Sequence, residues 1–563
     1  MSRRTWARNA LVAPVAAFAR AAPSPVALAR SLRVSFSTLD VVAPSEAVVG
    51  DPVTLRVQAW DDYERLVRGF EGAVALETTD PRATLPRETR FRASEGGVHR
   101  VEVTFETPGL QYVRAEVDGV TAAAPVAVSR EEPTLRTYWG DIHLHSQFSD
   151  GVGSMERGFA FGREVMGLDV VAYTDHDTMG FFIPPDLQRW LMRRRNLPKI
   201  RERVEAAHRP DEFVTLFGYE WTKQPHAGGH VNCYFDGTDA PFVDSRSPDS
   251  NTYEALWARL REWRAAKAPR RAAKAADDAE VPPEEATDVV TIPHHPAEAM
   301  YPFDFAATEV DDDLAPLVET YSQWGSSERP GEAGNRKPIG GIGQGEVGER
   351  GHYVADALAM GNRMGLVAGS DYHGPRPGRS PIHAPPHVPP LSEVRRDGLG
   401  WGTVWRLMAE DSYAGGLTAF RAPALTRAAV FDALRTRRVY GTTQPNRIRT
   451  AFTLEGRRLS DPDHEVSVDP RGEREVRLRV AGDAPLECVE VVKNTETWRT
   501  VDPGDGPAGY EDWVAEATLV DGAPLAGMQY DGERGTDADA YHLRVVQRDG
   551  GMAWAGPLWA VPE

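Results

Sequence analysis

Seven of the chain's 15 histidines stand at the ends of short apolar segments. The segment Gly140–His145 carries two of them, His143 and His145, and the loop after it supplies Asp150. Because side chains alternate along a strand, these two imidazoles are expected to share one face. Packed together without cations, so many imidazoles and carboxylates would suffer repulsion between like charges and would lose solvation. This pattern favours a fold that brings many strand ends to one place.

The central region alternates short, buried-looking strands with helical stretches, a pattern typical of a parallel α/β domain. Most of these strands are followed by a His, Asp or Glu, and a parallel barrel gathers such positions on one rim. We expect seven strands, at Gly140–His145, Leu168–Thr174, Val214–Tyr219, His230–Phe235, Val289–Pro293, Leu317–Tyr321 and Met364–Gly369.

The regions on either side of this α/β region show a β pattern. Runs such as Val53–Trp60 alternate apolar and polar residues, as strands with one solvated face do. We therefore predict an N-terminal β-sandwich over 32–135, an α/β domain over 136–445 and a C-terminal β-rich domain over 446–563. Within the α/β domain, the Ala-rich and charged segment 264–288 is predicted to be a flexible surface insertion.

Composition excludes several classes of protein. The formal net charge of -19 makes a nucleic-acid partner unexpected. Two distant cysteines, Cys233 and Cys488, build neither a disulfide framework nor a Cys-rich zinc motif. No apolar run is long enough to span a membrane. Residues 1–31 form a leader with a faint twin-arginine or Sec-like character, so both a cytoplasmic and an exported protein remain open.

Any metal site must therefore use His, Asp and Glu side chains. His294 and His295 are adjacent and are expected to point to opposite sides of a strand, so that only one of them binds metal. His176 has a carboxylate on each side that would orient its ring. The candidate ligands are His143, His145, Asp150, His176, Glu220, His230, His294, His295, Asp371 and His373.

The motifs H-L-H-S-Q-F-S-D-G, A-Y-T-D-H-D, P-H-H-P and S-D-Y-H-G together resemble those of the PHP superfamily, named for polymerase and histidinol phosphatase. The stretches W-G-D-I-H-L-H-S, G-G-H-V-N-C-Y-F and A-W-A-G-P-L-W look like the DUF3604 group of that superfamily. The resemblance covers roughly residues 138 to 444. It implies a distorted (β/α)7 PHP-type barrel, flanked here by the two β-sandwich domains, with two or three divalent metal ions (Zn, Mn or Fe).

The resemblance also implies how the ligands are shared. The first metal would take His143, His145, Glu220 and Asp371. Glu220 would bridge to a second metal held by His230 and one of the paired histidines, with His295 favoured because it precedes a proline. A third metal would take Asp150, His176 and His373. Some relatives have His in place of Asp150, which bears on metal preference.

A cluster of this kind points to hydrolysis. The leading hypothesis is a phosphoesterase that cleaves a small, anionic phosphate mono- or diester through a metal-bound hydroxide. Asp175 or Asp177 would orient His176, and Glu319 would lie behind the metals or face the substrate. Lys223, Arg376 and Arg379 are candidate phosphate contacts. The alternatives are hydrolysis of an amide, lactone or ester, and a surface binding protein without catalysis. The oligomeric state is not indicated.

Overall fold

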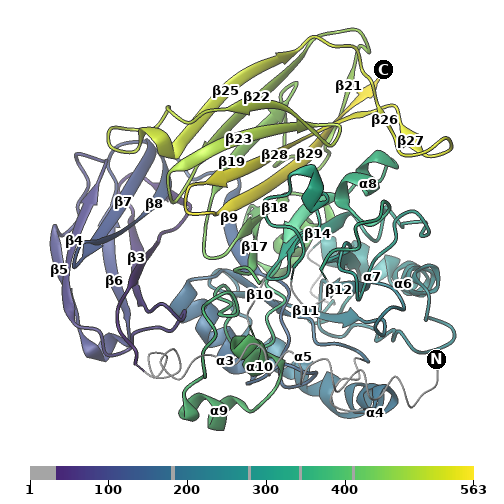
Figure 1. Ribbon diagram of the computed structural model, residues 1–563, viewed down its shortest axis with the longest axis horizontal. Coiled ribbons are helices and arrows are strands. Elements are labelled where there is room, and N and C mark those ends of the chain that lie inside the picture. Colours follow the sequence, from purple (N-terminus) through teal and green to yellow (C-terminus); the bar gives the residue numbers. More distant parts are fainter. Residues whose placement is uncertain (1–32, 179–183, 277–280, 341–344, 409–411) are drawn as a thin grey trace.

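The computed structural model describes residues 33–178, 184–276, 281–340, 345–408 and 412–563. The predicted leader, residues 1–31, lies outside the described residues. Within the described part of the chain, no helix combines the length and the apolar character needed to cross a bilayer. Figure 1 shows three regions, with an N-terminal sheet pair on one side, a C-terminal one above, and the helices gathered around the central region.

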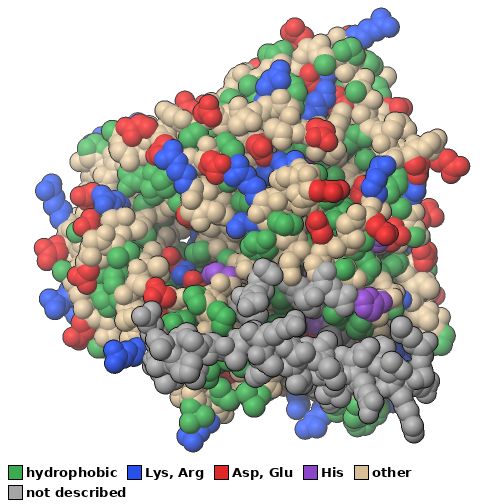
Figure 2. Space-filling model, viewed as in Figure 1, with side chains coloured by type: hydrophobic (Ala, Val, Ile, Leu, Met, Phe, Trp, Pro, Cys, Tyr) green, Lys and Arg blue, Asp and Glu red, His purple; other side chains and the backbone are tan. Residues whose placement is uncertain are grey.

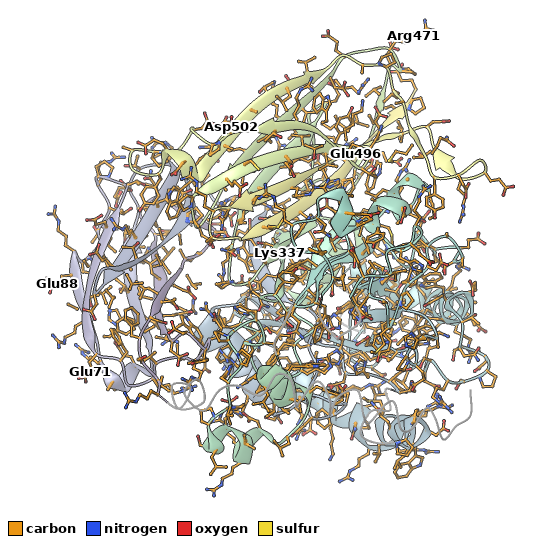
Figure 3. All side chains as sticks on the ribbon, in the orientation of Figure 1. Glu71, Glu88, Lys337, Arg471, Glu496 and Asp502 are labelled. Atoms are coloured by element: carbon orange, nitrogen blue, oxygen red, sulfur yellow. The ribbon has the colours of Figure 1, made fainter. Side chains whose placement is uncertain are left out.

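The N-terminal region is two sheets that enclose a core of their own. Leu55 and Val57 of one sheet, and Val113 and Val126 of the other, are buried in this core, as the alternating pattern predicts. One sheet has the order β1 (Thr38–Val42), β3 (Pro52–Trp60), β6 (Val98–Thr104), and the other β2 (Glu46–Val48), β8 (Val120–Ser129), β7 (Gly109–Val117), β4 (Gly72–Thr78), β5 (Glu88–Phe91). Charged side chains such as Glu71 and Glu88 point outward from it (Figure 3).

One long sheet runs from the central region into the C-terminal region. Its central part has the order β13 (Val289–His294), β12 (His230–Phe235), β11 (Val214–Trp221), β10 (Val170–Tyr173), β9 (Arg136–Asp141), β17 (Gly416–Ala422) and β18 (Val439–Thr443). From β18 it continues through β29 (Met552–Pro562), β28 (Asp539–Gln547), β23 (Leu486–Lys493) and β24 (Glu496–Val501), with β21 (Glu465–Val468) beside β29.

The expected (β/α)7 barrel is wrong. The described part of the chain is mostly β, with 36% strand against 18% helix, and it shows only one half-barrel. A strand overlaps each of the seven predicted places, but β12 pairs antiparallel with both β11 and β13. A closed parallel barrel would also need the free edge of β9 for another parallel strand, whereas the antiparallel β17 occupies it. The seven-strand count missed β17 and β18 altogether.

The remaining central strands form a separate small sheet, β15 (Gly325–Ser326), β14 (Leu317–Ser322) and β16 (Gly365–Ala368), in which β14 and β16 are parallel. It packs against β13 and β18, so its strand ends face the same region as those of the long sheet. The helices around these strands are α3 (Met155–Ala160), α4 (Pro185–Leu191), α5 (Leu197–Ala207), α6 (Tyr253–Ala266), α7 (Ala268–Ala275), α8 (Val354–Ala359), α9 (Leu391–Asp397), α10 (Trp401–Met408) and α11 (Arg427–Arg435).

The C-terminal region has one sheet of its own and shares the other. The four-stranded sheet β20 (Arg457–Arg458), β19 (Arg449–Leu454), β22 (Arg474–Ala481) and β25 (Val514–Asp521) packs against the β29–β28–β23–β24 end of the long sheet. A small pair, β26 (Met528–Gln529) and β27 (Gly535–Thr536), lies at its edge. Glu328 of the central region lies against the long sheet. Arg544 of β28 and the indole of Trp554 of β29 donate hydrogen bonds to its carboxylate.

The segment predicted as a flexible insertion is partly ordered. Residues 264–266 end α6, and α7 follows to Ala275. Lys267 lies 2.9 Å and Arg270 2.7 Å from the carboxylate of Glu285. These ion pairs join the start of the segment to its end. Residues 277–280 lie outside the described residues.

Candidate metal centre

The structure brings all ten predicted ligands into one buried cluster. They fall into overlapping groups whose nitrogen and oxygen atoms lie within 4.8 Å of one another. Each residue is at most 7% exposed. The groups are His143–His145–Asp371, His143–Glu220–His294, His176–Glu220–His230, His230–His294–His295 and His145–Asp150–His176–His373. A half-barrel is therefore enough to gather the strand ends that the barrel was expected to gather.

Glu220, near the end of β11, lies at the centre of the cluster. Its Oε2 is 3.0 Å from His176 Nδ1 and 3.1 Å from His145 Nε2. Its Oε1 is 2.7 Å from His294 Nε2 and also contacts His230 Nδ1. The two oxygens thus face different groups of imidazoles, as a carboxylate that bridges two cations does.

Two short segments, 143–145 and 371–373, lie side by side next to Glu220, and in each of them the first and third residues are candidate ligands. The strand predicted over Gly140–His145 ends at Asp141, but the chain continues past it and pairs once with the segment around Tyr372. The amide of Asp371 donates to the carbonyl of His143, and the amide of His145 donates to the carbonyl of Tyr372. This pairing keeps His143 and His145 on one side and places Asp371 Oδ1 3.0 Å from His145 Nε2.

The adjacent histidines His294 and His295 do not point to opposite sides, which corrects the prediction. His295 has a φ of 33°, so the chain leaves extended geometry there and its side chain swings to the side of His294. Their ring centroids are 3.7 Å apart, and both rings lie in one group with His230. Asp371 also has positive φ, at 53°. Such strained residues are often found at functional sites.

One group places three imidazoles around the carboxylate of Asp150, those of His145, His176 and His373. Its Oδ1 lies 3.4 Å from His373 Nε2 and 3.6 Å from His176 Nε2. The ring of His145 lies between those of His176 and His373, with centroids 4.1 Å from each. Trp405 of α10 packs against the outer side of His373, at a centroid distance of 4.6 Å.

Glu319, on β14, lies directly behind the cluster. Its Oε2 is 2.9 Å from His143 Nδ1, and its Oε1 is 3.7 Å from His294 Nδ1. With its Nδ1 turned to a carboxylate, His143 presents Nε2 to the centre of the cluster. This is the arrangement by which a carboxylate fixes the tautomer and the orientation of a metal-binding histidine. Of the two positions expected for Glu319, behind the metals or facing the substrate, the structure favours the one behind the metals.

Asp175 and Asp177 do not orient His176. Asp175 accepts hydrogen bonds from the amide and hydroxyl of Ser146, at 2.8 and 2.7 Å, so it shapes the loop that leads to Asp150. Asp177 accepts from the amides of Thr222 and Ser245, at 3.0 and 2.6 Å. Because the chain alternates there, both carboxylates point away from the side that His176 occupies.

The side chain beside the ring of His176 belongs to Thr222 instead. Its hydroxyl lies 2.8 Å from His176 Nδ1 and donates to the carbonyl of Glu220.

The cationic side chains predicted to contact phosphate are engaged by other groups. Arg376 donates to the backbone carbonyl of Glu64 in the N-terminal region, and Arg379 forms ion pairs with Glu64 and Asp40. The ammonium of Lys223 lies 4.6 Å from the ring centroid of Trp221 and donates to a backbone carbonyl. Burial and Arg406 lower the pKa of Arg376 to about 10, so its charge is kept.

The electrostatics divide the cluster into two kinds of imidazole. Burial opposes charge on His145, but the Asp371 and Glu220 carboxylates outweigh it and raise the pKa of His145 to about 10. By contrast, burial and the neighbouring imidazoles lower the pKa of His230 to about 4 and that of His373 to about 3. Burial would raise the pKa of Glu220, but the histidines around it hold that pKa well below the usual value.

The donor atoms meet the test for a cation site. His145 Nε2 lies 3.1 Å from Glu220 Oε2 and 3.0 Å from Asp371 Oδ1, and all three atoms are buried, yet none of them makes a well-aligned hydrogen bond. His143 Nε2 and Asp150 Oδ1 are in the same state. Unpaired buried polar atoms are costly, and side chains whose lone pairs face a shared point suit a metal ion. Imidazole with carboxylate is a ligand set that Zn, Mn and Fe accept.

Sequence reasoning missed several residues that surround the cluster. The indole of Trp324 donates to Asp371 Oδ2, and the ring of Tyr301 lies 4.4 Å from that of His230. Trp405 and Thr222 were also missed. Trp and Thr are not typical metal ligands, so the sequence pattern did not single these residues out. Thr222 alone stood close to a predicted ligand, two residues after Glu220.

Comparisons with known proteins give relatives but no family. No family model matches the chain. It is 23% identical over 536 residues to an uncharacterized protein of Chlamydia pneumoniae, which spans 92% of this chain and 73% of that protein. An uncharacterized protein of Chlamydia trachomatis is 22% identical with the same coverage. Among solved structures, domains 4 and 5 of the S-layer protein SbsC match 17% of this chain and 53% of theirs, with 19% identity and a TM-score of 0.14.

Proposed function

We propose that this chain is a metal-dependent phosphoesterase that acts on a small, anionic phosphate mono- or diester. The observation that carries the proposal is the buried cluster of seven imidazoles and three carboxylates, with Glu220 at its centre. Divalent cations bound there would act as Lewis acids on a phosphoryl oxygen and lower the pKa of a bound water. The motifs that resemble the PHP superfamily and its DUF3604 group support the same chemistry. The proposal does not depend on a closed barrel.

The chain's own residues would prepare this site before a substrate arrives. Glu220 faces two groups of imidazoles, and its two carboxylate oxygens would help to hold divalent cations there. Glu319 fixes the orientation of His143, and Thr222 lies against the ring of His176. Asp175 fixes the loop that carries Asp150. Because these partners are buried and hydrogen-bonded, the ligands need little rearrangement when cations bind.

One observation favours a second candidate, hydrolysis of an uncharged ester, lactone or amide. The three cationic side chains expected to contact a phosphate are engaged elsewhere, Arg376 and Arg379 with the N-terminal region and Lys223 with Trp221. None of these three side chains is then available to match the charge of a phosphate, and that role falls to the metal ions. Such ions polarise carbonyl oxygens equally well.

A substrate screen with a matched pair of variants tests the proposal. Protein loaded with Mn or Zn is assayed on phosphomonoesters, phosphodiesters, carboxylic esters, lactones and amides. We expect turnover of at least one phosphate ester, with loss of about 10²-fold or more in Glu220→Gln because the central carboxylate is removed. Asp80→Asn changes a buried carboxylate of the N-terminal region and should leave turnover unchanged. Turnover of esters or lactones alone would establish the second candidate.

A further inference from the structure

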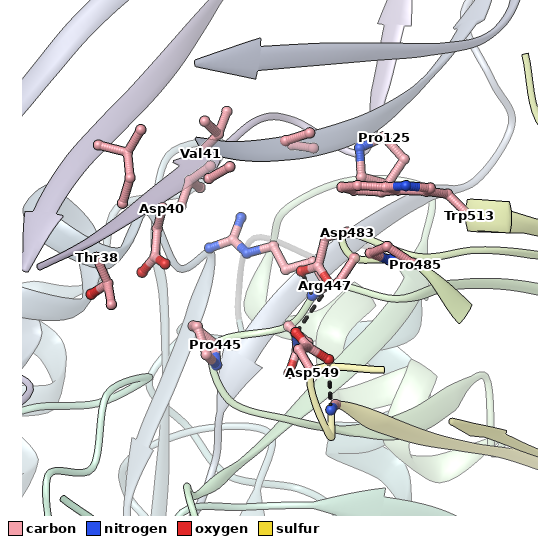
Figure 4. Close-up of a pocket in the computed structure, with 18 of the residues that line it drawn as sticks. Thr38, Asp40, Val41, Pro125, Pro445, Arg447, Asp483, Pro485, Trp513 and Asp549 are labelled. Carbon is pink, nitrogen blue, oxygen red and sulfur yellow. Dashed lines mark hydrogen bonds between the residues drawn. The ribbon is translucent and has the colours of Figure 1, made fainter. Parts of the chain in front are cut away.

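A large cavity lies apart from the metal cluster, where the three regions of the chain meet. Its volume is about 1200 Å3, and none of the ten candidate ligands lines it. Its wall takes Asp40 and Pro125 from the N-terminal region, Arg447 from the segment after β18, and Asp483 and Trp513 from the C-terminal region (Figure 4). Figure 2 shows the surface hollowed between the N-terminal region and the rest of the molecule. Cavities at domain junctions are common ligand sites.

An aromatic corner forms one part of this wall. The rings of Tyr112 and Tyr510 stack at 4.3 Å with an interplanar angle of 12°, and Trp513 stands edge-on to both. The hydroxyl of the buried Tyr112 donates to the carbonyl of Gly482, at 3.1 Å, and so ties the N-terminal to the C-terminal region. Tyr510 and Trp513 are only half-buried and line the cavity. The corner thus presents a rigid, partly exposed aromatic surface.

Carboxylates held by amides form an adjoining part of the wall. The Asn446 side-chain amide nitrogen lies 3.1 Å from Asp483 Oδ1 and 3.3 Å from Asp549 Oδ2. The backbone amide of Arg447 donates to Asp483 Oδ2, at 2.7 Å. Gln547 donates to Asp483 Oδ1 as well. Asp483 Oδ2 and Asp549 Oδ2 each accept only one of these hydrogen bonds within the described part of the chain, so each keeps a second lone pair as an acceptor for a ligand.

The charges along the wall nearly balance. Five carboxylates and four cationic side chains line the cavity. Asp40 and Glu64 share Arg379, and Arg114 lies 3.6 Å from Glu77. Lys337, placed where the central and C-terminal regions meet (Figure 3), has its ammonium 5.2 Å from the ring centroid of Tyr413. A wall so balanced gives no strong field of one sign and does not select an ionic ligand.

We propose that this cavity binds a neutral oligosaccharide. A sugar ring has an apolar C–H face, which packs on an aromatic surface, and a rim of hydroxyls that both donate and accept. The aromatic corner at Trp513 offers a surface for the C–H face. The Asp483–Asn446–Asp549 group offers hydrogen-bond partners for the hydroxyls. The volume exceeds the usual 300–1,000 Å3 of small-ligand pockets, which suits a ligand of more than one ring.

Calorimetric titration of the full chain tests this inference. Maltotriose, cellotriose, chitotriose and mannotriose serve as neutral probes, and trigalacturonate as an anionic one. We expect at least one neutral trisaccharide to bind, about tenfold more weakly to Trp513→Ala and nearly unchanged to Trp513→Phe, which keeps an aromatic face. Trp498→Ala removes a half-buried indole outside the cavity wall and should bind like the wild type.

Folding is checked separately by thermal unfolding of each variant. If Trp513→Ala unfolds, Asp483→Asn replaces it and should weaken binding while it keeps the shape of the wall. Binding of none of the neutral probes at millimolar concentration would overturn the inference, as would binding of trigalacturonate alone. Affinity unchanged in both Trp513→Ala and Asp483→Asn would overturn it too. Metal content and substrate turnover take no part in this test, so it stands independently of the proposed function.

Discussion

Replacing Glu319 by Gln should weaken metal binding without removing a ligand. In the structure Glu319 Oε2 lies 2.9 Å from His143 Nδ1, and the two residues are 2% and 0% exposed. Glutamine keeps the shape and an oxygen that accepts, but it loses the charge that makes His143 a better donor to a cation. Loss of such a partner typically costs 10- to 100-fold in metal affinity. That corresponds to about 1.4 to 2.7 kcal/mol.

The assay is competition between the metal-free protein and a chromophoric chelator for Zn or Mn. Glu298→Gln is the matched control, since Glu298 is also buried but, among the described residues, accepts from the backbone amides of Met300 and Tyr301 and not from a histidine. Burial raises the pKa of Glu298 to about 7, so near neutral pH its substitution by a neutral amide removes less negative charge than the substitution of Glu319 does. Equal affinity in Glu319→Gln and the wild type, within about twofold, would refute the argument that Glu319 holds His143 for a cation.

Three further outcomes are expected. Glu220→Gln should bind at least one metal ion fewer than the wild type by elemental analysis, while circular dichroism stays unchanged; equal metal content would contradict a bridging role. The chain without residues 446–563 should be insoluble, because β18 loses its partner β29 and exposes a strand edge; a soluble, folded 1–445 fragment would count against this. Glu46→Gln should destabilise the fold by about 3 to 5 kcal/mol near neutral pH, because Arg449 and Arg421 lose a buried partner. Burial would raise the pKa of Glu46, but these two arginines outweigh it and hold that pKa below the usual 4.5. The stabilisation is therefore complete above pH 4.5 and lost as the pH falls below it, so urea unfolding should show the variant and the wild type converge in acid. A difference that persists in acid would speak against the ion pairs.

The sequence predicted the strands and the gathering of the ligands, but not the architecture that gathers them. Apolar runs such as those of β11 and β12 show only that both faces are buried, and they look alike in parallel and antiparallel pairs. The direction of pairing depends on connections that single segments do not reveal. For the same reason β17, which takes the free edge of β9, was not anticipated.

Within the site, the chemistry of the residues was more informative than the geometry of single side chains. The ten His, Asp and Glu positions were identified because each stands near a strand end. Their orientations were not, since the turn at His295 reverses the alternation on which the prediction rested. Arg376 and Arg379 were misplaced because their partner, Glu64, lies some three hundred residues away in another region.

The unbroken sheet from β13 to β24 has a consequence for how such a gene can change. A recombination event that carried residues 136–445 into another protein would take β18 without β29. The backbone hydrogen bonds between these two strands would then be lost. The smallest piece that evolution can shuffle intact is then 136–563. Fusions, swaps and inherited deletions should have their breakpoints before β9 and not at the junction near Pro445.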